Sequence, residues 1–157
     1  MGTHLVPWVA NAVSDPRALA LSVEDGLEEG AIVLLASDVV ASERQVSAAA
    51  FAAQRRWERG TAVARSLAAE FMRCLAGSHH VGEAIRAVGL TAGAERGWLV
   101  AISVASSEVD QRMVANGLQP ASQHAMTPEG RARLGLPSAG DAEVLALGRV
   151  AESDLLA

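Results

Sequence analysis

The chain has 157 residues, half of them hydrophobic and a fifth charged, which suits one domain with a buried core. Its formal net charge of −5 argues against a protein that binds nucleic acid over its whole surface. The longest apolar run, residues 31–36, is too short to span a bilayer, and no basic region followed by an apolar one opens the sequence, so we expect a cytoplasmic protein. The single cysteine, Cys74, excludes an internal disulfide and a multi-cysteine zinc site.

The first third of the chain predicts a strand, a helix and a second strand. Residues 3–13 are typical of a β-strand, and Pro7 near its start favours an edge or bulged strand, because proline donates no ladder hydrogen bond. The start and stop signals of the helix are Ser14 or Asp15 as the N-cap, Pro16 in the first turn and Gly30 at the end. The apolar run 31–37 has the length of a strand, which we expect at the centre of a sheet.

Residues 43–59 predict an amphipathic helix, with Ser42 as a possible N-cap and Gly60 as its stop. Its apolar side chains recur on one face, namely Val46, Ala49, Ala50, Ala53 and Trp57. Three arginines lie off this stripe: Arg55, Arg56 and Arg59. We therefore expect a buried apolar face and a basic outer face.

Two further helices follow. Thr61 can cap the first, which Gly77 ends, and Ser78 can start the second, residues 79–88, which Gly89 closes. The buried stripe of the first is Ala64, Leu67, Ala68, Phe71 and Leu75, and that of the second is Val81, Ala84, Ile85 and Val88. Arg65 and Arg73 lie elsewhere on the first helix, so we expect both on its outer surface.

The C-terminal part predicts one good strand, residues 96–106, and a helix that Ser106 or Ser107 caps and Asn116 ends. Further expected elements are a short strand within 119–126, a short helix after Thr127 and Pro128, and a strand or helix from 141 onward. Three or four strands among five or more helices predict one α/β (α+β) domain over residues 1–157. We expect a small mixed or antiparallel sheet of about four strands, packed with several helices.

Two adjacent histidines, His79 and His80, stand at the predicted break between helices. Neighbours on a helix point about 100° apart, so the pair cannot readily chelate one metal, and no HExxH or CxxC motif accompanies it. A triad of Ser78, His79 and Glu83 is conceivable, but helix capping and an i, i+4 pair are the simpler interpretation. Cys74 is typical of a buried, inert thiol. We expect a binding domain without catalytic residue, metal ligand or cofactor; the alternative is a small α/β metal- or ligand-binding domain or enzyme that uses His79, His80 and Glu83.

Two residue types are missing from the sequence, and their absence excludes further kinds of catalytic site. The sequence has no lysine and no tyrosine, which excludes Schiff-base chemistry, a P-loop lysine and a tyrosine general acid. The three tryptophans, Trp8, Trp57 and Trp98, fall in predicted strands or on a helix stripe. We interpret all three as packing residues, and RNA stacking is the alternative for Trp8 and Trp98.

The charge is unevenly distributed. Between Arg44 and Arg86 seven arginines stand against three acidic residues, so this segment carries +4 and the remainder −9. A basic region of this kind can hold an RNA segment by its phosphates. The alternative is a pair of ordinary solvated helix faces.

Residues 54–90, QRRWERGTAVARSLAAEFMRCLAGSHHVGEAIRAVGL, resemble the signature region of the kinase-binding subunit of the KEOPS complex, the TPRKB-like family, and we expect an archaeal member. The matching positions are Trp57, Glu58, Arg59 and Gly60 at a helix end, Ala64, Ser66, Leu67, Glu70, Phe71, Leu75 and Gly77 in the next helix, and Val81, Ala84, Ile85 and Gly89 after it. The similarity extends more weakly over residues 37–53. His79 and His80 stand where the family has Arg-Gln, which replaces a permanent charge with a mostly neutral ring.

The resemblance implies a role that composition does not reveal. KEOPS installs the threonylcarbamoyl group on adenosine 37 of tRNA, and this subunit is not the catalyst. It implies that the chain binds and regulates the small atypical kinase (ATPase), recruits tRNA through its 3′ CCA end, and so serves the transferase subunit indirectly. The residues expected to face RNA are Arg55, Arg56, Arg59, Arg65, Arg73, His79 and His80.

Overall fold

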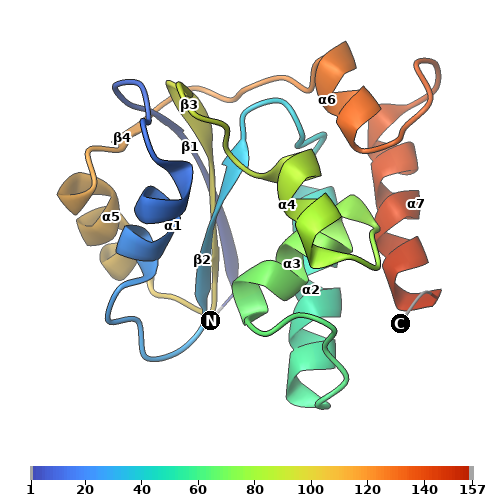
Figure 1. The fold of residues 1–157 in the computed structure, drawn as a ribbon, viewed down its shortest axis with the longest axis horizontal. Helices are drawn as coiled ribbons and strands as arrows, with labels where there is room; N and C mark the ends of the chain where they lie inside the picture. The colour runs from blue at the N-terminus through green and yellow to red at the C-terminus, as the bar shows by residue number, and fades with distance from the viewer. Residues whose placement is uncertain (1, 156–157) are drawn as a thin grey trace. The chain divides into compact units, whose positions relative to one another are not determined.

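The computed structural model describes residues 2–155, which form a four-stranded antiparallel sheet and seven helices (Figure 1). This α+β architecture confirms the predicted fold class. The chain divides into two compact units: unit 1 comprises Met1–Ser37 and Leu90–His124, and unit 2 comprises Asp38–Gly89 and Ala125–Ala157. No helix within the described residues is long and apolar enough to cross a membrane.

Unit 1 contains the whole sheet, in the strand order β2-β3-β1-β4. The strands are β1 (Thr3–Val9), β2 (Ala31–Ala36), β3 (Arg96–Ile102) and β4 (Gln119–Pro120). The strand β3 lies inside the sheet, and each of its residues after Arg96 is buried. The prediction of a central β2 is wrong, because β2 is an edge strand. Its first five residues are all buried, and such a run indicates two covered faces but not the strand's place in the sheet.

The strand β1 lies between β3 and β4, so the prediction of an edge strand at Pro7 is wrong. The ladder with β4 is short, however, and includes only Trp8 and Val9. Pro7 itself lies opposite Trp98 on β3, and its carbonyl accepts a hydrogen bond from the Ala121 N–H just past β4. The predicted strand within 119–126 is only two residues long, and it ends at Pro120.

The helices α1 (Pro16–Glu24) and α5 (Ser106–Ala115) lie beside the sheet in unit 1 (Figure 1). The Asp15 carboxylate accepts a hydrogen bond from the Ala18 N–H, which confirms the predicted cap. However, α1 ends at Glu24 instead of reaching Gly30. The guanidinium of Arg112, on α5, donates to the carbonyls of Val23 and Asp25 at the end of α1.

One hydrophobic cluster joins the sheet to these two helices. Its buried members are Trp8, Val13, Val23, Ile32, Leu34, Leu99, Ala101, Val104, Val109, Met113 and Leu118. The indole of Trp8 lies against Gly97 on β3, where any Cβ would collide with the ring.

The N-cap of α5 is Ala105, whose side chain forms no capping hydrogen bond, so the predicted Ser106 or Ser107 cap is wrong. Asn116 ends the helix as predicted.

Unit 2 is helical, with α2 (Glu43–Glu58), α3 (Leu67–Ala76), α4 (Val81–Val88), α6 (Pro128–Arg133) and α7 (Ala142–Leu155). The helix α3 packs against α2, α4 and α7. Ser42 and Thr127 cap α2 and α6 through their hydroxyl groups, as predicted. The cap of α3 is Ser66 and not Thr61, because residues 61–66 form a loop.

Candidate nucleic-acid interface

The two units differ in charge. Unit 2 contains ten arginines and ten acidic residues, whereas unit 1 contains three arginines and eight acidic residues. The whole net charge of −5 therefore belongs to unit 1. All seven residues that we expect to face RNA lie in unit 2, on α2, α3 or the segments that follow them.

Two of the seven, Arg59 and Arg65, are exposed arginines. Arg59 occupies the C-cap position of α2, and Arg65 lies in the loop just before α3. Within the described side chains neither forms an ion pair. Both positive charges therefore face solvent, as a contact to phosphate requires.

Arg55 is half-buried on the outer face of α2, with its guanidinium carbon 5.6 Å from the ring centroid of Phe51. Phe51 itself is 66% exposed. The sequence signal for this exposure is that Phe51 lies off the apolar stripe of the helix. Trp57 is 43% exposed, so its prediction as a packing residue is wrong. It lies in the last turn of α2, where fewer neighbouring elements cover a side chain.

Arg56 and Arg73 are buried, and the expectation that they lie on an outer surface is wrong. Arg56 is 8% exposed and donates to the backbone carbonyl of Ser153. Arg73 is 0% exposed and forms a two-point ion pair with Glu70, which is also fully buried. The Glu70 carboxylate, one turn earlier on α3, holds the Arg73 guanidinium inside the protein. Neither Arg56 nor Arg73 can reach RNA in this structure.

The Glu70 carboxylate is well satisfied. Its oxygens accept hydrogen bonds from Arg73 Nε at 3.0 Å and Nη2 at 2.7 Å, and also from the backbone N–H groups of Val63 and Ala64. Burial would raise the pKa of Glu70, but the Arg73 guanidinium and these amides outweigh it and hold the pKa below its usual value. The carboxylate therefore stays ionised inside the helical unit.

His79 and His80 are exposed in the turn between α3 and α4, with their ring centroids 5.6 Å apart in an edge-on arrangement. The Ser78 hydroxyl accepts a hydrogen bond from the His80 N–H and lies 3.2 Å from a Glu83 oxygen, to which it can donate. Glu83 thus interacts with Ser78 and not, as predicted, with His79. Among the described residues no three His, Cys, Asp or Glu side chains gather as metal ligands would.

Cys74 is buried beside Arg73, as predicted for a structural thiol. Burial raises its pKa, and a hydrogen bond to Ser153 and the nearby arginines oppose this only in part. A raised pKa keeps the sulfur protonated at neutral pH, and a protonated thiol is a poor nucleophile.

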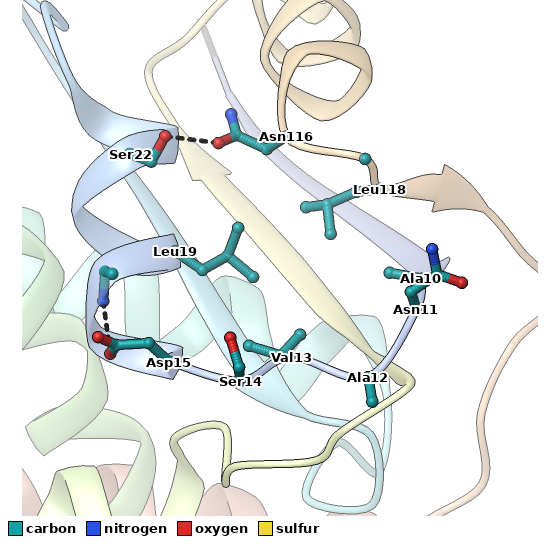
Figure 2. Close-up of a pocket in the computed structure, with 12 residues that line it drawn as sticks. Ala10, Asn11, Ala12, Val13, Ser14, Asp15, Leu19, Ser22, Asn116 and Leu118 are labelled. Carbon is teal, nitrogen blue, oxygen red and sulfur yellow. Dashed lines mark hydrogen bonds between the residues drawn. The ribbon is translucent and has the colours of Figure 1, made fainter.

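A pocket of about 460 Å³ opens in unit 1 between the β1–α1 loop and the end of α5 (Figure 2). Ser22 donates to the side-chain oxygen of Asn116 at 2.6 Å on its wall. Asp15, the one charged side chain of the lining, is engaged as the cap of α1. This pocket holds no base or nucleophile arranged for catalysis.

The comparisons with known proteins agree with a binding role. The model of the family described as kinase binding protein CGI-121 matches residues 10–126, well over half of the chain. The match includes the basic segment and the Trp57–Gly60 helix end, and members of this family are non-catalytic kinase-binding subunits. Compared with the curated proteins, the chain finds no match. The chain belongs to the CGI-121 family of kinase-binding proteins.

Proposed function

We propose that this chain is the non-catalytic subunit of a KEOPS complex that binds the small atypical kinase and recruits tRNA, by its 3′ CCA end, for modification of adenosine 37. The family match over residues 10–126 is the observation that carries this proposal. In this role the transferase subunit, and not this chain, performs the chemistry.

The RNA side of the proposal depends on exposed basic and imidazole groups in unit 2. The residues that remain after the buried arginines are left out are Arg55, Arg59, Arg65, His79 and His80. Arginine holds phosphate as a permanent cation, whereas an imidazole ring can stack on a base or form a hydrogen bond with it. Because the salt dependence grows with the number of phosphate contacts, three arginines predict a modest weakening of tRNA binding as salt is added.

The kinase side needs exposed apolar side chains, because such residues anchor stable interfaces. Ile85 on α4 and Val144 on α7 are 48% and 64% exposed, and both lie on helices other than α2. We expect at least one of the variants Ile85→Glu and Val144→Glu to lose co-purification with the kinase while it still binds tRNA. Retention of the kinase by both variants would exclude these two positions.

Filter binding of tRNA with and without its CCA end tests the RNA half directly. We expect retention of intact tRNA and a loss of about tenfold in affinity after removal of the CCA end. Equal binding of the two tRNAs would contradict recognition of the CCA end, and no binding of either would contradict tRNA recruitment by this chain. Co-purification with the kinase is measured separately and shows that the protein is folded.

A further inference from the structure

The Glu70–Arg73 pair is buried in a way that stability alone does not explain. Both side chains are 0% exposed, and the bidentate geometry joins Nε and Nη2 of Arg73 to the two oxygens of Glu70. Moving two charges out of water is costly, and apolar side chains of similar volume often serve a core as well or better. The burial of the pair therefore indicates a role besides stability.

Each partner uses its spare hydrogen-bonding capacity on a different loop. Glu70 Oε1 accepts from the N–H groups of Val63 at 3.1 Å and Ala64 at 3.0 Å, in the loop before α3. Arg73 Nη1 donates to the carbonyl of Ser78 at 3.1 Å, in the turn after α3. One buried pair thus anchors the backbone at both ends of the same helix.

The anchored backbone carries the exposed residues of the proposed RNA surface. Arg65 follows Ala64 directly, and His79 and His80 follow Ser78. The turn is fixed further by the Ser78 N–H, which donates to the Arg73 carbonyl. Holding these side chains in place before RNA arrives removes part of the entropy cost of binding.

We infer that Glu70 and Arg73 are positioning residues for tRNA, which orient Arg65 on one side and His79 and His80 on the other without touching RNA. This inference rests on the proposed function. Its partner is the same single-stranded RNA end, and what it adds is the device that holds the contacting residues in place.

Two double variants that differ only at position 70 separate the two anchors. In Glu70→Leu/Arg73→Met both anchors are lost, whereas in Glu70→Gln/Arg73→Met the glutamine oxygen can still accept from Val63 and Ala64. We expect amide hydrogen exchange to quicken over 62–66 and 77–80 in the first variant, and over 77–80 alone in the second. The affinity for tRNA should fall about tenfold in the first variant and less in the second, with kinase binding unchanged in both.

A background without the contacting side chains distinguishes positioning from general loss of stability. In Arg65→Ala/His79→Ala/His80→Ala the contacts are already gone, so adding Glu70→Leu/Arg73→Met should cause no further loss of tRNA affinity. A further loss of the same size in this background would overturn the inference, and so would wild-type affinity in the double variant. If wild-type protein fails to bind tRNA, the proposed function fails instead.

Amide hydrogen exchange in the wild-type protein tests the Glu70 anchor without a variant that could misfold. The amides of Val63 and Ala64, bonded to Glu70, should exchange at least about tenfold more slowly than those of Ala62 and Arg65, for which the described residues supply no acceptor. Equal exchange at the four amides would show that the loop is not anchored and would overturn the inference.

Discussion

At the scale of single residues, the main contribution of Arg73 to stability is that it neutralises the buried Glu70 carboxylate. If Arg73 is replaced by methionine, an ionised carboxylate is left buried with only two backbone amides to compensate it. We expect Arg73→Met to lower the free energy of unfolding by about 3–5 kcal/mol at pH 7, and Glu70→Gln/Arg73→Met to recover at least half of that loss. Denaturant unfolding of the three proteins measures both effects. A single variant as stable as the wild type would mean that the pair is not buried in solution.

The same pair predicts a dependence on pH. The pKa of Glu70 is lower in the folded protein than in the unfolded chain, where the carboxyl has its ordinary value. Its stabilising contribution is therefore fully present above that value and is lost as pH falls below it. Relative to Glu70→Gln/Arg73→Met, the wild type should lose more stability between about pH 5 and pH 3. Parallel unfolding curves over that range would contradict the lowered pKa.

The buried arginines also mark the limit of what the sequence reveals at this scale. The helix period puts Arg73 away from the predicted apolar stripe, but α3 buries side chains on more than that stripe, so the period misplaces Arg73. Arg59 is exposed as the same reasoning predicts, whereas Arg65 is exposed in the loop before α3. The burial of Arg73 had one visible signal, which is Glu70 three residues earlier on the same helix. Such a pair is usually exposed, so its burial depends on α2, α4 and α7 packing around α3, which no local pattern contains.

At the scale of elements, caps and glycines made the helices of unit 2 predictable. Ser42, Thr127 and Gly77 act where the sequence places them. The predicted Thr61 cap fails because Glu70 holds the amides of the 61–66 loop, and the predicted Ser78 start of α4 is wrong because His80 is its N-cap. The strands were harder to place. A buried apolar run such as β2 has the same pattern at a sheet edge as at its centre, because side-chain burial and strand pairing are independent properties.

The close approach of α3 to α7 at Gly77 gives a test at this scale. Gly77 has a φ of +64°, and a Cβ there would collide with the backbone carbonyl of Arg149 on α7. Gly60 has a similar φ of +71°, but a Cβ there would meet nothing within 4 Å. We expect Gly60→Ala to cost about 1 kcal/mol from backbone strain alone and Gly77→Ala to cost clearly more, measured by thermal or denaturant unfolding. Equal losses would mean that α7 does not pack on the end of α3.

At the scale of the whole molecule, the separation of charge between the units is the feature most relevant to function. Unit 1 carries the whole net charge of −5, whereas the ten arginines of unit 2 are balanced by ten acidic residues, so under the proposed function the neutral unit can present cations to RNA. The fold class, the family and the location of the basic segment were predictable from the sequence, because they depend on the order and spacing of motifs. The identity of the exposed cations was not, because it depends on packing between helices.

A matched pair of charge reversals tests the central claim most directly. Arg59→Glu/Arg65→Glu and Arg17→Glu/Arg96→Glu change the net charge equally, and all four arginines are exposed, but the first pair lies in unit 2 and the second in unit 1. In filter binding we expect the first variant to bind tRNA about tenfold or more weakly, with the salt dependence of log Kd reduced by about 2, and the second to bind nearly as the wild type does. Both should still co-purify with the kinase. Wild-type tRNA affinity in the first variant, or an equal loss in both, would contradict the assignment of the RNA surface to unit 2.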